Sequence, residues 1–406
     1  MRFALAAAAL LLAAAAPAAA PARFIAPGAE LEVSLDSGLP LSWRVCRPDC
    51  RTPRVQRELL GPAAVLLRWD GDAALAGRLA TAGYRAERHG DELRLRSLQP
   101  VAGRIREHRY RWDPATGSVA LALDLPRGAG LSLRAEPGFA PEPLPGFGSI
   151  YSRVRAIVVD ENGQQWLDEW LQASPSAAPG DGDWLGLRQR FWAVLLQSSR
   201  ATTVTLEQAQ ANMPVLRLRF PEQEPQQLRL AAGPVERAWL RSVDPVLGGL
   251  LYAALWNWLR GLCILMAGLL GLLVALTGSP GGAIMLLSLC VKLLMSPLTR
   301  IADRWQAEVQ RIQARLEPEL AAIRRQFRGE EAHERVLAVY RQQGVSPWYT
   351  LKSAAGFLIQ IPVFIAAFDT LGESFLLHQA GFLWIDDLAK PDRLAPLPLA
   401  LPFFGA

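Results

Sequence analysis

From residue 261 to residue 299 the chain carries one charged side chain, Lys292, in an otherwise apolar run. About 20 consecutive apolar residues are enough for a helix to span the hydrocarbon core of a bilayer. Moving a lysine to the centre of that core costs about 2.5 to 3.5 kcal/mol on insertion scales. The run therefore indicates a membrane segment, and Lys292 needs a polar environment within it or at its edge.

The 406 residues divide by pattern into two parts. Residues 23–245 alternate polar and apolar side chains in short segments, whereas residues 246–406 contain long apolar runs. We expect a mixed fold, in which a periplasmic antiparallel β-sandwich is followed by an α-helical membrane domain with a cytoplasmic helical hairpin. The net charge of +5 comes from scattered arginines without a zinc-finger or RNA-binding motif, so no direct nucleic-acid partner is expected.

Residues 1–22 combine a basic start, an apolar core and small residues near Ala18 and Ala20. This pattern is typical of a signal peptide, and an uncleaved signal anchor of the same length is the alternative. Either one delivers the next residues to the periplasmic side of a bacterial inner membrane.

The expected β-sandwich shows period-two alternation broken by Gly and Pro, for example in residues 30–35, 64–69, 92–97, 110–124 and 214–220. Its two histidines, His89 and His108, belong to no metalloprotease, serine-hydrolase or phosphate-loop motif. We therefore expect no enzyme activity, no cofactor and no metal site.

Four cysteines are present. Cys46 and Cys50 lie close enough in the exported part to form a small disulfide, and a metal pair is the weaker alternative because no matching second pair exists. Cys263 and Cys290 lie in apolar runs, where small packing residues are expected.

The membrane domain is predicted to contain five segments. They are an interfacial helix at 250–277 whose second half could span instead, a span at 282–299, a polar loop at 300–349, a span at 351–371 and the start of a further span at 394–406. Residues 300–352 hold ten basic and seven acidic side chains, which places this loop in the cytoplasm by the positive-inside rule.

Within the loop, apolar residues recur at steps of three and four, which predicts a helix with one apolar stripe. A second stripe follows the turn at residues 328–331, so the two helices can pair as a hairpin, with coiled-coil dimerisation as the alternative. The residues that we single out in this hairpin are Ile312, Leu316, Pro318 and Tyr340.

A polar stripe runs along the predicted span 282–299 because Ser288, Lys292, Ser296 and Thr299 follow helical spacing. The return span carries small or polar residues at similar steps, namely Ser353, Gly356, Gln360, Ala367, Thr370 and Ser374. Two such faces can line a hydrated groove within the membrane. The alternative is that Lys292 extends its ammonium to the headgroups while the small residues serve helix packing. Asp369, near a helix end, is interpreted as mainly structural.

Eight segments of the sequence share a further feature, and they are residues 184–192, 232–236, 291–299 (VKLLMSPLT), 316–320 (LEPEL), 339–347 (VYRQQGVSP), 357–364 (FLIQIPVF), 382–388 (FLWIDDL) and 391–392. Taken in chain order, these segments resemble the YidC/Oxa/Alb family of membrane protein insertases, in the Gram-negative form with a large periplasmic domain.

The resemblance implies a groove, open to cytoplasm and lipid, that accepts hydrophilic parts of nascent inner-membrane proteins while their apolar spans move into the bilayer. It implies that Lys292 is the cation of this groove, and the helical spacing places Ser288, Ser296, Thr299 and Gln360 on the polar faces that line it. It also implies the Sec translocon, the ribosome and signal recognition machinery as further partners. Family members have more core spans than the sequence provides, so a truncated chain, a fragment or an inactive relative is expected. A membrane-anchored periplasmic module that binds carbohydrate or protein is the alternative function.

Overall fold

The computed structural model describes residues 20–144, 146–173, 179–180, 182–198, 203–210, 212–220, 225–343 and 351–391. Most of the predicted leader and the predicted span at 394–406 lie outside these residues. The chain forms two compact units. A β unit contains Met1–Pro141, Arg153–Gly233 and Trp239–Leu247, and a helical unit contains Glu142–Ser152, Pro234–Ala238 and Gly248–Ala406.

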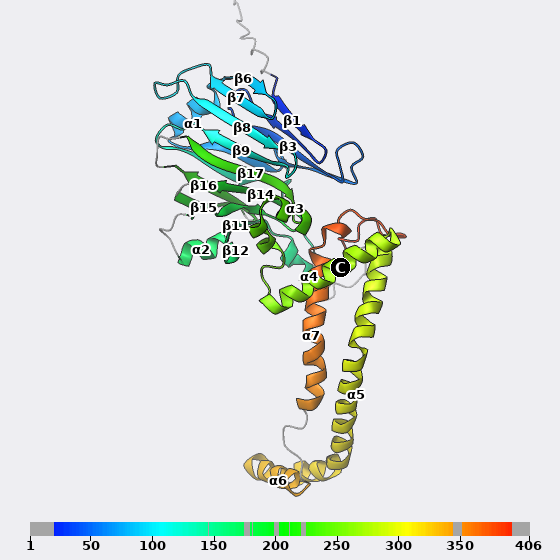
Figure 1. Cartoon of the computed structure of the whole chain (residues 1–406). Helices are drawn as coiled ribbons and strands as arrows, with labels where there is room; N and C mark the ends of the chain where they lie inside the picture. Colours follow the sequence, from blue (N-terminus) through cyan, green and yellow to red (C-terminus); the bar gives the residue numbers. More distant parts are fainter. Residues whose placement is uncertain are drawn as a thin grey trace, which may run out of the picture. The chain divides into compact units, whose positions relative to one another are not determined.

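The β unit holds two large sheets (Figure 1). The first has eight strands in the order β1 (Ala22–Ala26), β2 (Ala29–Val33), β3 (Pro40–Arg47), β4 (Val55–Leu60), β5 (Val65–Gly71), β10 (Ala129–Ala135), β16 (Met213–Arg219) and β15 (Thr203–Gln210). The second has nine in the order β12 (Gly163–Trp166), β11 (Arg155–Asp160), β13 (Trp184–Arg188), β14 (Trp192–Ser198), β17 (Gln226–Pro234), β9 (Ser118–Leu123), β8 (Glu107–Asp113), β7 (Glu92–Ser97) and β6 (Tyr84–His89).

The expected antiparallel sandwich is confirmed at the level of two mainly antiparallel sheets. One pair differs: β4 and β5 are joined in parallel through the single bridge between Leu60 and Val65. The chain turns tightly between these strands, and Gly61 with a φ of 149° provides the backbone conformation for that turn. Three short helices were not expected, and they are α1 (Ala73–Ala80), α2 (Leu167–Ala173) and α3 (Arg237–Val243).

Local sequence explains the β8–β9 hairpin. Its two strands alternate buried and exposed residues, as a half-buried strand does. In the turn, the carboxylate of Asp113 accepts hydrogen bonds from the backbone N–H of Ala115 and the hydroxyl of Thr116. Gly117 then has a φ of 62°, which glycine adopts without steric cost. The hairpin therefore closes with Asp113 opposite Ser118.

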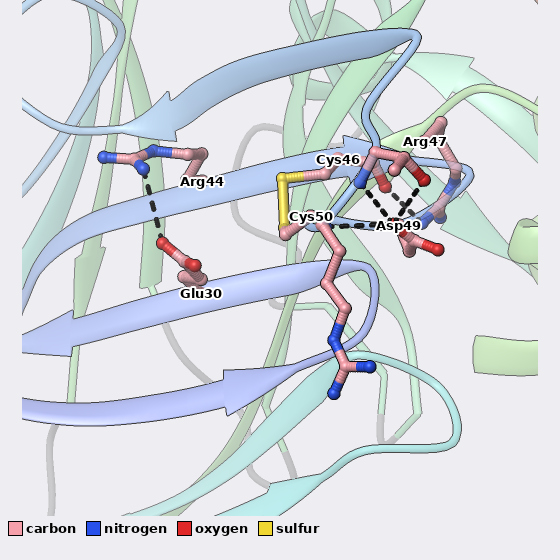
Figure 2. The surroundings of a disulfide bond; sticks show 8 residues. Glu30, Arg44, Cys46, Arg47, Asp49 and Cys50 are labelled. Carbon is pink, nitrogen blue, oxygen red and sulfur yellow. Dashed lines mark hydrogen bonds and ion pairs between the residues drawn. A yellow bond between two sulfur atoms is a disulfide. The ribbon is translucent and has the colours of Figure 1, made fainter.

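A disulfide joins Cys46 at the end of β3 to Cys50 in the following loop, as the spacing had allowed. Their Cα atoms are 5.0 Å apart. Figure 2 shows this bond with the ion pair between Glu30 and Arg44 nearby, on β2 and β3. Within the same loop, Asp49 accepts hydrogen bonds from the backbone N–H groups of Arg51 and Thr52. The disulfide therefore closes a loop that is already ordered by local hydrogen bonds.

The helical unit contains four longer helices, drawn in Figure 1. They are α4 (Asn257–Thr277), α5 (Pro280–Gln326), α6 (Gly329–Gln342) and α7 (Leu351–Gly372), accompanied by the 3₁₀ helices η1 (Gly146–Tyr151) and η3 (Phe375–Leu377). A further 3₁₀ helix, η2 (Pro245–Leu250), lies where the β unit meets the helical unit in the chain. Among the described residues, α4 and α5 are long and apolar enough to cross a membrane, and Gln360–Gly372 is a shorter apolar stretch of α7.

Two helix boundaries differ from the sequence-based expectation. The predicted helix at 250–277 begins at Asn257, because Tyr252 has a φ of 52° and Trp256 is extended, so neither continues a helix. The predicted span at 282–299 is part of α5, which continues without a break to Gln326. At its start, the Ser279 hydroxyl accepts a hydrogen bond from the N–H of Gly282, and Pro280 stands at the first position, where its missing N–H costs little.

The first part of α5 packs against α4 and α7 through apolar side chains. A buried cluster there consists of Leu270, Leu273, Ala283 and Leu287. Cys263 of α4 is fully buried against α7, as expected of a small packing residue. Cys290 of α5 is half-buried. These contacts hold three helices together within the helical unit.

The last part of α5 contacts α6 (Figure 1). Leu316 is buried and Ile312 and Tyr340 are half-buried, whereas Pro318 is exposed inside the helix. The Arg335 guanidinium lies 3.6 Å from the centre of the Phe327 ring. Two apolar residues earlier in α5, Ile301 and Trp305, are exposed. The 14 residues of α6 are about 21 Å long, too short to reach back along α5 to these positions.

Candidate functional site: a groove between α5 and α7

A cavity of about 920 Å³ lies between α5 and α7, and we call it the α5–α7 groove. Its described lining contains all five residues that the sequence had grouped: Ser288, Lys292, Ser296, Thr299 and Gln360. The remaining lining residues are Leu287, Leu289, Val291, Met295, Arg300, Val363, Phe364, Ala367 and Leu371. Polar side chains thus form a narrow strip in a mainly apolar groove.

The α5 wall of the groove carries the polar strip because its four residues are spaced by four, four and three along one helix. Ser288 and Lys292 are exposed, and Ser296 and Thr299 are half-buried. The Thr299 hydroxyl donates a hydrogen bond to the carbonyl oxygen of Met295 at 3.0 Å. That bond satisfies the Thr299 donor within its own helix, so the hydroxyl can stay in an apolar setting at little cost.

Pro297 lies within α5 beside this strip. A proline inside a helix removes one backbone N–H, which leaves the carbonyl of the residue four positions earlier, Leu293, without its helical partner. On α7, Pro362 does the same for Leu358. Both walls of the groove therefore contain a turn with one backbone hydrogen bond fewer than a regular helix.

Among the described lining residues of α7, all are apolar except Gln360. The Gln360 side chain is exposed and can both donate and accept hydrogen bonds. Phe364, one turn further, is 70% exposed, which is unusual for an aromatic side chain unless lipid or a partner covers it. This wall can therefore contact an apolar segment while offering one amide to a polar one.

Of the described residues that line the groove, two are charged, and both are cationic. Lys292 lies about 12 Å before Arg300 along the axis of α5, at 1.5 Å per residue. Among the described residues no ion pair neutralises Lys292 in the groove. The groove therefore has a positive field that attracts carboxylates and repels cations.

Parts of the predicted return stripe lie elsewhere. Thr370 faces α4, where its hydroxyl donates a hydrogen bond to the carbonyl oxygen of Cys263 at 3.3 Å. Ala367 lines the groove, and Ser374 precedes η3. Nothing is described for the side chains of Ser353 and Gly356. Thr370 was wrongly grouped with Gln360 because residues ten positions apart are offset by about 80° on a helix.

The sequence-based reasoning missed Arg300 as a lining residue, and it missed the apolar residues Val363 and Phe364. Arg300 follows the apolar run directly, so its position one turn after Ser296 was the available signal. For Val363 and Phe364 no signal separated groove lining from lipid contact, since both environments are apolar.

Part of the chain matches a known protein family. Residues 272–404 match the family model described as 60Kd inner membrane protein. The membrane protein insertase YidC of Chloroherpeton thalassium is 26% identical over 257 residues, covering 59% of this chain and 42% of that protein. The YidC of Syntrophobacter fumaroxidans is 31% identical over 181 residues, covering 44% and 31%.

A solved structure, the active YidC insertase crystal structure with the first transmembrane domain resolved, is 15% identical and covers 92% of this chain and 76% of its own, with a TM-score of 0.31. That score is too low to show a common fold. The chain spans less than half the length of the curated relatives described above. Those relatives are named as insertases, in agreement with the expectation that the chain is not an enzyme. Through the matched family model and these relatives, the chain is similar to the YidC family of membrane protein insertases.

Proposed function

We propose that the chain acts as a membrane protein insertase and chaperone, and that the α5–α7 groove receives the hydrophilic part of a nascent inner-membrane protein. The observation that carries the proposal is the composition of the groove: a polar strip with Lys292 on one wall and an apolar wall with Gln360 and Phe364 on the other. The relatives of the chain are membrane protein insertases by name, which supports the same function.

The groove lowers the cost of moving a short polar tail through hydrocarbon. A polar group that leaves water without a hydrogen-bond partner loses several kcal/mol in an apolar medium. Ser288, Ser296 and Gln360 can replace part of the lost hydration, and Lys292 attracts acidic residues of the tail. The apolar span of the substrate contacts the exposed Phe364 side and then enters lipid, where burial of its surface provides the driving force at about 25 cal/mol per Å².

The orientation that fits this function places the β unit in the periplasm and the end of α5 with α6 in the cytoplasm, in the inner membrane. The basic residues that follow the apolar part of α5 support this orientation, since positive charge is retained on the cytoplasmic side. In this orientation the end of α5 and α6 face the cytoplasm, where the ribosome and the signal recognition machinery are the partners that can bind them. The chain acts alone or beside the Sec translocon.

Photo-crosslinking from defined positions tests the proposed function. The chain is placed in membrane vesicles with a crosslinking amino acid at Ser296 or Gln360 in the groove, or at the exposed positions Leu294 or Leu358, which are absent from the groove lining. A ribosome-bound nascent protein with one apolar span and an acidic tail is then supplied. We expect crosslinks to the tail from Ser296 and Gln360 and few from Leu294 and Leu358.

Charge at Lys292 provides the matched control. Lys292→Arg keeps the positive charge and should keep the crosslinks, whereas Lys292→Glu should reduce them for an acidic tail and not for an uncharged one. Equal crosslinking from all four positions, unchanged by Lys292→Glu, would show that the groove does not receive the tail. A membrane-anchored binding module would also give equal crosslinking that Lys292→Glu does not change.

A further inference from the structure

Residues 142–152 leave the β unit between β10 and β11 and return to it, but by their contacts they belong to the helical unit. Hydrogen bonds join the two ends of this segment. The Ser152 hydroxyl donates a hydrogen bond to the carbonyl oxygen of Glu142 at 3.3 Å and accepts one from the N–H of Leu144 at 2.7 Å. The 3₁₀ helix η1 lies between these ends and presents Tyr151.

Tyr151 contacts three residues at the C-terminal end of α7. Its hydroxyl donates a hydrogen bond to the carboxylate of Asp369 at 2.7 Å. Its ring centre lies 5.9 Å from that of Phe368. A Cβ atom on Gly372 would overlap the Tyr151 ring and hydroxyl, so Gly372 is the residue that lets the two approach. The Tyr151 side chain therefore fits closely against one side of α7.

An ion pair joins the same segment to the chain beyond α7. The Lys390 ammonium forms an ion pair with the carboxylate of Glu142 at 2.6 Å. Both side chains are at least half exposed, so this pair contributes little to stability and mainly fixes where the two segments meet. Segment 142–152 is thus connected to α7 itself and to the residues that follow it.

The contacts of α7 divide around its axis. With 3.6 residues per turn, Phe368, Asp369 and Gly372 lie on one side, which faces Tyr151. Ala366 and Thr370 lie on a second side, where both contact Cys263 of α4. The third side carries the groove residues Gln360, Phe364, Ala367 and Leu371.

We propose that Tyr151 is a positioning residue that fixes the rotation of α7 about its axis and so directs the Gln360 side toward α5. The hydrogen bonds with α4 hold one side of α7, and its packing against α5 is apolar and therefore non-directional, so a small rotation about the helix axis remains open. The hydrogen bond from Tyr151 to Asp369, on a second side, removes that freedom. The inference rests on the proposed function only in the purpose that it gives to this rotation, which is to present Gln360 to a substrate. The rotation of α7 itself does not require a substrate.

Pulsed electron paramagnetic resonance on the full chain in lipid nanodiscs tests the positioning role. Spin labels at Leu294 on α5 and Leu358 on α7 are both exposed and lie away from Tyr151. We expect Tyr151→Ala and Asp369→Leu each to shift or broaden the distance distribution between the labels. Ser149→Ala, an exposed change in η1, is the matched control and should leave the distribution as in the unaltered chain.

The two variants act from different segments. Asp369→Leu leaves residues 142–152 intact, so misfolding of that segment in Tyr151→Ala cannot account for a shift in both. Asp369→Asn keeps an acceptor oxygen for the Tyr151 hydroxyl and should keep the distribution. The proposal is wrong if either Tyr151→Ala or Asp369→Leu gives the distribution of the control. Because no substrate is present, this result is independent of whether crosslinking from Gln360 succeeds.

Discussion

The hydroxyl of Thr370 donates a hydrogen bond to the backbone carbonyl oxygen of Cys263 at 3.3 Å, which joins α7 to α4 across 107 residues of sequence. Both residues are buried. A single hydroxyl thus marks the side of α7 that packs against α4, and the groove residues follow on another side. The sequence had assigned Thr370 to the groove, and the structure gives it this structural role.

Removing the Thr370 hydroxyl should loosen this helix contact. Thr370→Val keeps the shape of the side chain and deletes one hydrogen bond, which we expect to lower the free energy of unfolding by about 1 kcal/mol. Thermal or denaturant unfolding of the chain in detergent micelles measures the change. Thr299→Val is the control, because that hydroxyl bonds to the carbonyl oxygen of Met295 in its own helix. A smaller loss for Thr370→Val than for Thr299→Val would contradict the assignment.

His108 should make the β unit less stable in acid. Burial of the ring lowers the pKa of His108 from 6.5 to about 4, and the Asp124 carboxylate only partly opposes this. The unfolded chain therefore binds a proton between pH 6.5 and pH 4 while the folded chain does not. Stability is retained above pH 6.5 and falls by roughly 3 kcal/mol in total as the pH drops to about 4, with no further loss from this residue below that.

The pH dependence can be checked by denaturant unfolding of the chain at pH 7, 5.5 and 4, followed by near-ultraviolet circular dichroism. His108→Phe keeps an aromatic ring beside Tyr84 and Trp69 but cannot bind the proton, so it should flatten the loss between pH 6.5 and 4. His89→Gln is the control because that side chain is exposed. The same slope in His108→Phe as in the unaltered chain would exclude His108 as its source.

The disulfide between Cys46 and Cys50 should contribute modestly to stability. It closes a loop of only five residues, for which loop entropy gives about 2 kcal/mol. Cys50→Ala should therefore lower the free energy of unfolding by that amount or less, and added reductant should lower the unaltered chain to the same level. Cys290→Ala, which removes a free thiol, should not change the response to reductant. A response to reductant that persists in Cys50→Ala would show that another bond is involved.

Local features of the fold were predictable because their causes are local. Residues 92–97 alternate in polarity and form β7, and the polar strip from Ser288 to Thr299 follows from helical spacing alone. Sheet order was not predictable: β10 pairs with β5 and β16, and nothing in the short alternating segments distinguishes these partners from others. The hydrogen bond from Tyr151 to Asp369 joins residues 218 positions apart, so it too depends on the tertiary fold.

The start of α5 should depend on the absence of a side chain at Gly281. A Cβ atom there would overlap the ring of Phe382, which lies in a tight turn closed by two backbone hydrogen bonds with Ile385. Because the turn limits how far the ring can move, Gly281→Ala should lower the free energy of unfolding by about 1 to 3 kcal/mol, even though alanine favours a helix. Unfolding in detergent micelles measures this loss.

Phe382→Ala should remove the overlap and so recover the loss in the double variant. The expected signature is a favourable coupling energy between the two changes, of about 0.5 to 3 kcal/mol, as found for residues in contact. Gly268→Ala in α4 is the matched control, because a Cβ atom at that position meets nothing within 4 Å. If Gly281→Ala and Phe382→Ala have strictly additive effects, the two residues are not in contact, and the start of α5 is held in place by Leu287 and its neighbours in the apolar cluster.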